Sequence, residues 1–220
     1  MRRTSRSFLV LVLLAPACAA RVPHTQPEDM SAQAHRAEAA QHLAEAERAR
    51  QRIQQRDHGR YEGSVSHTRD GSSYSYRWDT ERWIQEAEGI EHLAAAQALE
   101  REYAFACALI PEAEQGVSAI EVFIEGVDRV GDRAVSIRLG AAAGPPEQLV
   151  HRLRCHRARM AVLGLDGMRD CPLAVRGLVV TVRAIPGGME VLVAPRDVGL
   201  LPEIERRARA LLARARSNHD

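Results

Sequence analysis

The stretch AIEVFIEGVDRVGDRAVSIRLG, residues 119–140, decides the fold because its apolar side chains recur at every second position. A Gly-Asp pair separates the two alternating runs, which consist of Ile120, Val122, Ile124, Val135, Ile137 and Leu139. A period of two residues is typical of a β-strand with one buried face, and the glycine between the runs favours a tight turn. The stretch therefore predicts a β-hairpin and marks the start of a second structural unit after a helical segment.

The elements that follow repeat the same order. A helix is expected over residues 146–163, a second hairpin over residues 175–194 with a Pro-Gly-Gly turn, and a last helix over residues 202–216. The sequence therefore predicts a ββαββα unit at 113–220. Such a unit forms a two-layer α/β sandwich, in which a four-stranded antiparallel sheet carries both helices on one face.

Outward toward the N-terminus, residues 30–112 predict an antiparallel helical hairpin, so that the fold class of the chain is α+β. Residues 31–56 are rich in Ala, Glu, Gln and Arg, which favour helices, and a second helix is expected from Asp79 or Thr80 to Ile110. The apolar stripes expected to meet are Ala39, Leu43, Ala46 and Ile53 on the first helix and Trp83, Ala87, Ile90 and Ala94 on the second, continued by Leu99, Tyr103, Ala106 and Ile110.

The first residues have the pattern of an export signal. Arg2, Arg3 and Arg6 precede the apolar run FLVLVLL, and small residues follow at Ala15 and Ala17. The apolar run is about half as long as the roughly 20 residues that a transmembrane helix requires. Residues 1–17 are therefore expected to be a signal peptide, and the chain is expected to be exported.

The cysteine at the end of this signal, Cys18, resembles the lipobox cysteine of bacterial lipoproteins. The resemblance implies acylation of Cys18 and a protein anchored to a membrane, expected to be the outer one, and facing the periplasm. Residues 18–29 are then a lipidated N-terminus and a polar tether. Two alternatives stay open: ordinary signal peptidase cleavage before Cys18 with release of the chain, or a Cys18 that is a plain loop thiol.

Composition excludes several functions. The chain of 220 residues has 30 basic and 29 acidic residues, a net charge of +1 that predicts no nucleic-acid partner. It contains no lysine, which excludes a Walker lysine and a pyridoxal phosphate attachment site. Since it also lacks GxSxG, CxxC and Gly-rich phosphate motifs, we expect no enzyme activity, no cofactor and no identified small-molecule substrate.

Three cysteines follow the signal, and an exported chain is expected to pair two of them. Cys155 and Cys171 are the expected disulfide, because a loop of about 15 residues is easily closed and the bond contributes roughly 3 kcal/mol in the chain-entropy model. Cys107 is then expected to be a buried free thiol on a helix.

A metal site is the alternative interpretation of the same region. His151 and Cys155 lie four residues apart on a predicted helix, and with His156 they form a candidate site for a soft metal in a periplasmic metal-binding or redox protein. His35 and His42, seven residues apart, are expected to be solvated helix positions.

The segment between the two N-terminal helices, residues 61–78, mixes Tyr, Ser, Gly and Arg as binding loops often do. Its candidate partner-binding residues are Tyr74, Tyr76, Arg77 and Trp78, with a plain connector as the alternative. The sequence as a whole predicts a lipid-anchored protein that serves as a non-catalytic binding or envelope-scaffolding module for other envelope proteins.

Overall fold

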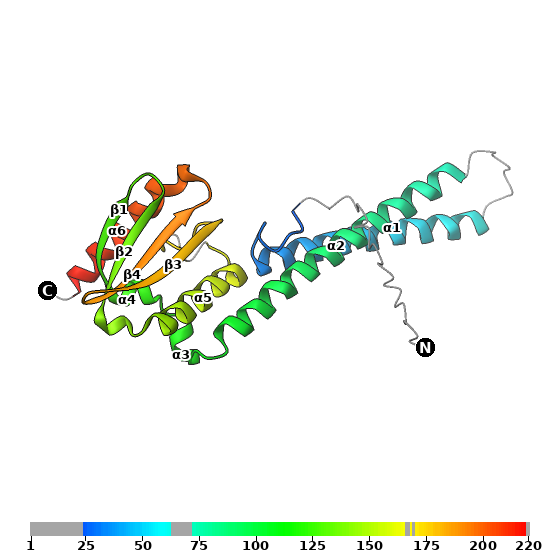
Figure 1. The fold of residues 1–220 in the computed structure, drawn as a ribbon. Helices are drawn as coiled ribbons and strands as arrows, with labels where there is room; N and C mark the ends of the chain where they lie inside the picture. Colours follow the sequence, from blue (N-terminus) through cyan, green and yellow to red (C-terminus); the bar gives the residue numbers. More distant parts are fainter. Residues whose placement is uncertain (1–23, 63–71, 166–167, 169, 219–220) are drawn as a thin grey trace, which may run out of the picture.

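The computed structural model describes residues 24–62, 72–165, 168 and 170–218, which form a long helical arm and an α/β head (Figure 1). The arm consists of the helices α1 (Ala32–Glu62) and α2 (Ser72–Cys107). The head contains α3 (Glu112–Gln115), α4 (Ala119–Phe123), β1 (Ile124–Val130), β2 (Ala134–Gly140), the 3-10 turn η1 (Ala141–Ala143), α5 (Pro146–Leu163), β3 (Leu178–Ile185), β4 (Gly188–Pro195), the 3-10 turn η3 (Val198–Leu200) and α6 (Leu201–Ser217). This α+β architecture confirms the predicted fold class.

The four strands form one antiparallel sheet in the order β1-β2-β4-β3. Val135 and Ile137 of the central strand β2 face Val193 and Val191 of β4, so the two predicted hairpins join through their second strands. Both hairpin turns contain a glycine with positive φ, Gly131 at 55° and Gly187 at 85°. Glycine adopts this backbone region without steric cost, which is why these turns form where the sequence predicts them.

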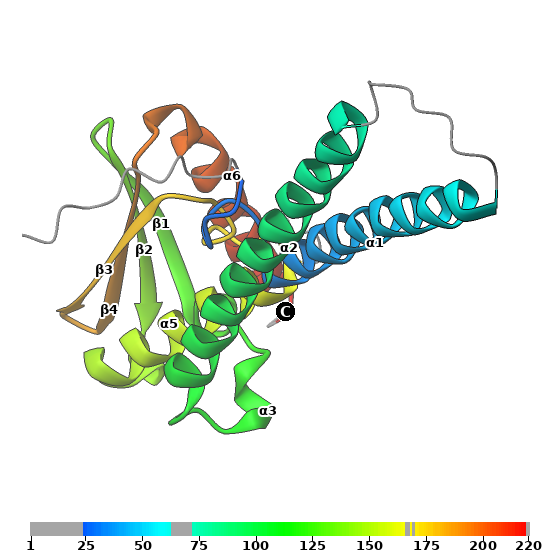
Figure 2. The same ribbon diagram turned by 90° about the vertical axis from the view of Figure 1, so that its right-hand side faces the viewer.

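The core lies between the sheet and the helices α5 and α6. Alternate residues of β2 and β4 pack with Leu149 and Leu153 of α5 and with Ile204 and Leu211 of α6 in one buried cluster. Because the strand residues of this cluster alternate along each strand, both helices cover the same face of the sheet. Figure 2 shows the sheet at the left of the head, with α5 running below it and α6 to its right.

The predicted start of β1 and the predicted ends of the arm helices are wrong. Residues 120–123 belong to the single helical turn α4, so β1 begins only at Ile124. The helices of the arm are longer than predicted, since α1 continues to Glu62 and α2 begins at Ser72. The regular apolar spacing of the sequence weakens before both ends, so it did not reveal how far the two helices continue.

The arm is continuous with the head because α2 extends beyond the start of α1 and packs along α5. Ala96 and Leu99 of α2 form a small buried cluster with Ala32 of α1. Ala161 and Val162 of α5 pack against this cluster. Farther along, the Tyr103 hydroxyl donates a 2.7 Å hydrogen bond to Oε1 of Gln115, the last residue of α3. The base of the arm is therefore fixed on the head by side-chain contacts of α2.

Candidate functional site

The seam between α1 and α2 is built from small residues. On α1 the buried side chains are spaced by three, four or seven residues, and Ala39, Ala46 and Ala49 are almost completely inaccessible. On α2 Gly89 lies so close to α1 that a Cβ atom there would approach Cγ of Leu43 to 2.9 Å. Small side chains let two helices approach closely, so the seam leaves little room for the larger apolar residues of α2.

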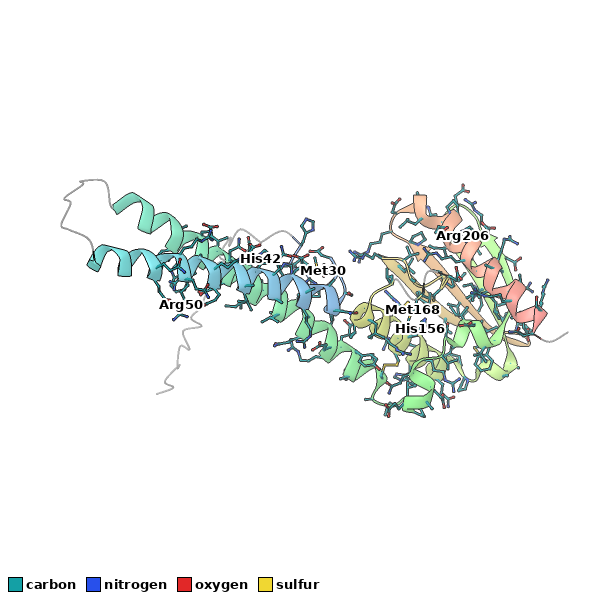
Figure 3. The ribbon with its side chains drawn as sticks, turned by 180° about the vertical axis from the view of Figure 1, so that it is seen from behind. Met30, His42, Arg50, His156, Met168 and Arg206 are labelled. Atoms are coloured by element: carbon teal, nitrogen blue, oxygen red, sulfur yellow. A yellow bond between two sulfur atoms is a disulfide. The ribbon has the colours of Figure 1, made fainter. Side chains whose placement is uncertain are left out.

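Histidines interrupt this seam of alanines. His35 of α1 and His92 of α2 are buried, and their Nδ1 atoms lie 3.0 Å apart. His42, one heptad after His35, stacks on His92 with ring centroids 5.5 Å apart and an interplanar angle of 11°. The prediction that His35 and His42 are solvated is therefore wrong for His35, which is fully buried. Figure 3 shows His42 in the arm, far from the head residue His156.

The hydrogen bonds define the proton positions in this cluster. Nε2 of His35 lies 3.1 Å from the carbonyl oxygen of Gln26, which can only accept, so this nitrogen carries a hydrogen. The neutral ring of His35 therefore presents a lone pair at Nδ1, to which His92 donates its Nδ1–H. Burial lowers the pKa of both imidazoles, and the neighbouring histidine lowers each pKa further, that of His35 through His92 and that of His92 through His42.

The segment before α1 closes over the histidine pair. The hydroxyl of Thr25, a buried side chain, donates a 3.1 Å hydrogen bond to Oε2 of Glu91 on α2. Arg176 of the head donates to the carbonyl oxygen of Asp29. Together with the His35–Gln26 contact, these bonds hold the segment between the arm and the head.

The outward face of α2 carries a row of exposed apolar side chains, which we name the outer α2 stripe. Its large members are Trp83, Ile84, Ile90 and Phe105. Exposure is 62% for Trp83, 61% for Ile90 and 86% for Phe105. The prediction that the Trp83, Ile90 row faces α1 is thus wrong, because the seam consists of small residues and histidines instead.

Acidic residues surround the upper part of the outer α2 stripe. Between residues 79 and 94 the helix has five acidic residues and one basic residue, namely Asp79, Glu81, Glu86, Glu88, Glu91 and Arg82. The guanidinium of Arg82 lies 4.9 Å from the centre of the Trp83 ring, in a cation–π arrangement. A large apolar stripe of this kind on a projecting helix is typical of an interaction surface.

The cysteines pair differently from the prediction. The disulfide joins Cys107 at the end of α2 to Cys155 on α5, while Cys171 is a free cysteine, so the predicted Cys155–Cys171 bond is wrong. The reason is the packing of α2 along α5, which brings two distant cysteines together. Burial raises the pKa of the Cys171 thiol, and Sγ of Cys171 lies 3.4 Å from Nε2 of His156.

The predicted metal site is not assembled. Cys155 is oxidised and offers no thiolate, His151 is exposed, and His156 faces Cys171. Burial lowers the pKa of His156, and Nδ1 of its ring has no hydrogen-bond partner among the described residues. In the part of the chain that the structure describes, no group of three or more His, Cys, Asp or Glu side chains is arranged to hold a metal ion.

Two other predicted sites lie wholly or partly outside the described residues. Cys18 lies outside the described residues. Tyr74, Tyr76, Arg77 and Trp78 belong to the first turns of α2, where the prediction placed a loop, and their side chains are also outside the described part.

A pocket of about 550 Å³ lies in the head between the start of β1 and α6. Its lining contains neither Ser, Thr, Cys nor His, and consists of Val122, Phe123, Ile124, Glu125, Gly140, Ala142, Leu212, Ala215 and Arg216. Glu125 and Arg216 are its only charged lining residues, and one carboxylate without a second catalytic group beside it indicates no particular reaction. The pocket therefore gives no argument for a reaction.

Comparison with known proteins gives no relative. No protein-family model matches the chain, and neither the curated proteins nor the solved structures include a significant match. No helix of the described residues combines the length and the low charge that a membrane span requires. The candidate site of the described residues is therefore on the arm. The sequence indicated neither a role for His92 nor the solvent-facing orientation of the outer α2 stripe.

Proposed function

We propose that this protein is a lipid-anchored lipoprotein that faces the periplasm and acts as a non-catalytic binding or scaffolding module for another envelope protein. The observation that carries the proposal is the outer α2 stripe, whose apolar side chains lie on a helix that projects from the head. The export pattern of residues 1–17 and the cysteine at position 18 support the anchored location.

The partner that fits the stripe is an amphipathic helix with basic residues beside its apolar face. Exposed apolar side chains such as Trp83 and Ile90 can be buried by a partner, and buried side chains of this size commonly anchor an interface. The acidic residues around them complement lysines or arginines of a partner and repel a second α2 helix in the same position. A neighbouring basic helix is therefore favoured over pairing of two identical stripes.

Binding is tested with the mature protein in lipid nanodiscs and two labelled helical peptides that share one apolar face. One peptide has lysines beside that face and the other has glutamates, and fluorescence anisotropy gives both dissociation constants. We expect the basic peptide to bind at least about tenfold more tightly, because complementary charge favours it. The double change Trp83→Gln and Ile90→Gln should weaken its binding by more than about tenfold, since two central apolar anchors are removed.

Val179→Gln is the matched control, because Val179 is 56% exposed but lies on β3 of the head. Equal binding of the two peptides, or an equal loss from Val179→Gln, contradicts a partner site on the outer α2 stripe. Light scattering tests for a dimer. If the molar mass is twice that of the monomer and the variant with both Trp83→Gln and Ile90→Gln is monomeric, the stripe binds a second copy of the chain instead.

The anchor is tested separately by intact mass spectrometry of the protein extracted with detergent from membranes of the bacterium. An N-terminus at residue 18 that carries the mass of its acyl chains supports the location. The variant Cys18→Ala should lose this mass and leave the membrane fraction. A mature chain that lacks acyl groups in the native protein contradicts the anchor and leaves ordinary secretion.

A further inference from the structure

The histidine cluster lies in the seam between α1 and α2, apart from the outer α2 stripe. His35 and His92 are both buried, and a buried polar pair in a seam of alanines costs stability unless its hydrogen bonds are complete. We infer that this pair is a pH-sensitive latch: at neutral pH it holds α1, α2 and the segment before α1 together, and protonation of both rings opens the seam.

Only one hydrogen fits between the two rings. The Nδ1 atoms of His35 and His92 are 3.0 Å apart, a hydrogen-bond distance that needs one donor and one acceptor. The carbonyl oxygen of Gln26 requires the hydrogen on Nε2 of His35, so the acceptor in the pair is Nδ1 of His35. A first added proton is accommodated on Nε2 of His92, whereas a second must go to Nδ1 of His35. Two N–H groups then point at each other, and the central hydrogen bond is lost.

Charged and titratable groups face the pair from each side. They come from the segment before α1, from α1 and from α2, and are Asp29, Glu38, His42, Glu88 and Glu91. From the head, Arg176 bonds to the carbonyl oxygen of Asp29. The carboxylates favour the first proton, while His42, stacked on His92, and the burial of both rings oppose charging of the pair. Burial is the largest of these effects for both rings, so the closed arm binds protons less readily than the open arm.

The sign of the pH dependence follows from this difference. In an opened arm the rings titrate near their ordinary pKa of about 6.5, and in the closed arm they titrate at lower pH. Closing is therefore fully favoured above about pH 6.5 and is weakened as the pH falls through 6.5 toward the lower pKa values. Each pKa unit by which a ring is lowered changes the closing equilibrium about tenfold at pH values below both.

Opening affects more than the two helices. The segment that contains Thr25 and Gln26 is bonded to Glu91 and His35, so separation of the seam also removes its support. Under the proposed anchor, this segment connects the arm to residue 18, and its release changes the reach of the protein from the membrane. That last consequence rests on the proposed function, whereas the latch itself requires neither a partner nor an anchor.

The test is amide hydrogen exchange of the full mature protein, followed by mass spectrometry at pH 7.5 and pH 5.0 and corrected for the intrinsic exchange rates. We expect peptides from α1 and from the α1-facing half of α2 to exchange roughly tenfold faster or more at pH 5.0. Peptides from β2 and β4 should be unchanged, since neither strand contains a histidine. His156 titrates in the head, and peptides from α5 report that effect separately.

The variant His92→Asn separates the latch from a general acid effect. The asparagine amide reaches the position of Nδ1 and provides both a donor and an acceptor, so it can bond to His35 in either protonation state. We expect its pH effect on the arm to fall below about threefold. His151→Asn is the control on an exposed histidine of α5 and should keep the full effect.

An arm that exchanges equally at both pH values overturns the latch, as does an undiminished pH effect in His92→Asn. Equal acceleration of β2 and β4 also overturns it, because this shows global unfolding. If circular dichroism shows that His92→Asn is unfolded at pH 7.5, an NMR titration of ¹⁵N-histidine in the unaltered protein decides. Apparent pKa values of both rings below about 6.5 support the latch, and values at or above 6.5 contradict it.

Discussion

At the scale of single residues, Gly188 is required by the close approach of β4 to β2. It faces Gly140 in the register of the two central strands, and a Cβ atom at position 188 would overlap the carbonyl oxygen of Leu139. This obstacle is backbone, which cannot rotate away as a side chain can. The residue therefore determines how closely the two hairpins join.

We predict that Gly188→Ala lowers the free energy of unfolding by about 2 kcal/mol or more, because the two strands must separate or bend to admit the methyl group. Urea unfolding followed by circular dichroism measures the change. Gly187→Asn is the matched control in the adjacent position, where φ is 85°, no atom lies within 4 Å and asparagine is tolerated. A Gly188→Ala protein as stable as this control contradicts the tight join.

The cysteine pairing shows which residue contacts a sequence cannot reveal. Loop closure favours the shorter link between Cys155 and Cys171, but the actual bond closes a separation of 48 residues. The pairing is decided by which cysteine side chains meet once α2 packs along α5. The same holds for His35 and His92, which are 57 residues apart and have no local signal that they touch.

At the scale of elements, the sequence predicts best where the signal is local. The helix expected at residues 146–163 has those bounds in the structure, and the turns at Gly131 and Gly187 lie where glycine is expected. Alternation is less reliable at the end of a run, since residues 120–123 satisfy a strand pattern but form α4. In a single helical turn, Ile120 is buried whereas Val122 is exposed, so only part of the alternating set reaches the core.

The orientation of α2 could not be predicted from hydrophobicity. Trp83 and Ile90 form the more apolar face, yet the face with Gly89 and His92 packs against α1. Close approach of two helices gains dispersion contacts along the whole seam, and large side chains would prevent it. A heptad spacing that joins His35, Ala39, His42 and Ala46 was the available signal for this seam.

Ala39→Leu tests the seam. Ala39 is completely buried between the helices, so three added carbon atoms must force α1 and α2 apart, and we predict a loss of about 1–3 kcal/mol. Thermal unfolding followed by circular dichroism measures it, because the arm contributes much of the helix signal. Ala40→Leu adds the same atoms at the exposed neighbouring position and should be nearly neutral. Equal stability of both variants contradicts a tightly packed seam.

At the scale of the whole molecule, the arm and the head are linked in two ways. The helix α2 packs along α5, and the Cys107–Cys155 bond joins the end of one to the middle of the other. A noncovalent contact between α2 and α5 alone permits the arm to rock against the head. The disulfide at the last turn of α2 adds a second fixed point to the contacts of Ala96 and Leu99. The direction of the outer α2 stripe relative to the head thus depends on both.

We predict that the double change Cys107→Ser and Cys155→Ser broadens the distribution of arm directions and lowers the free energy of unfolding by about 4 kcal/mol in the chain-entropy model. Double electron–electron resonance measures the distribution of distances between two spin labels. The labels are attached to unnatural amino acids at the exposed positions Gln54 of α1 and Val179 of β3.

Cys171→Ser is the control for this experiment, because it removes the free thiol but keeps the disulfide. The control should have the same narrow distribution of label-to-label distances as the unaltered protein. An equally narrow distribution in the double variant means that the packing of α2 on α5 alone directs the arm. The disulfide then contributes stability without orientation, and a partner bound to the stripe is presented at the same angle whether the bond is oxidised or reduced.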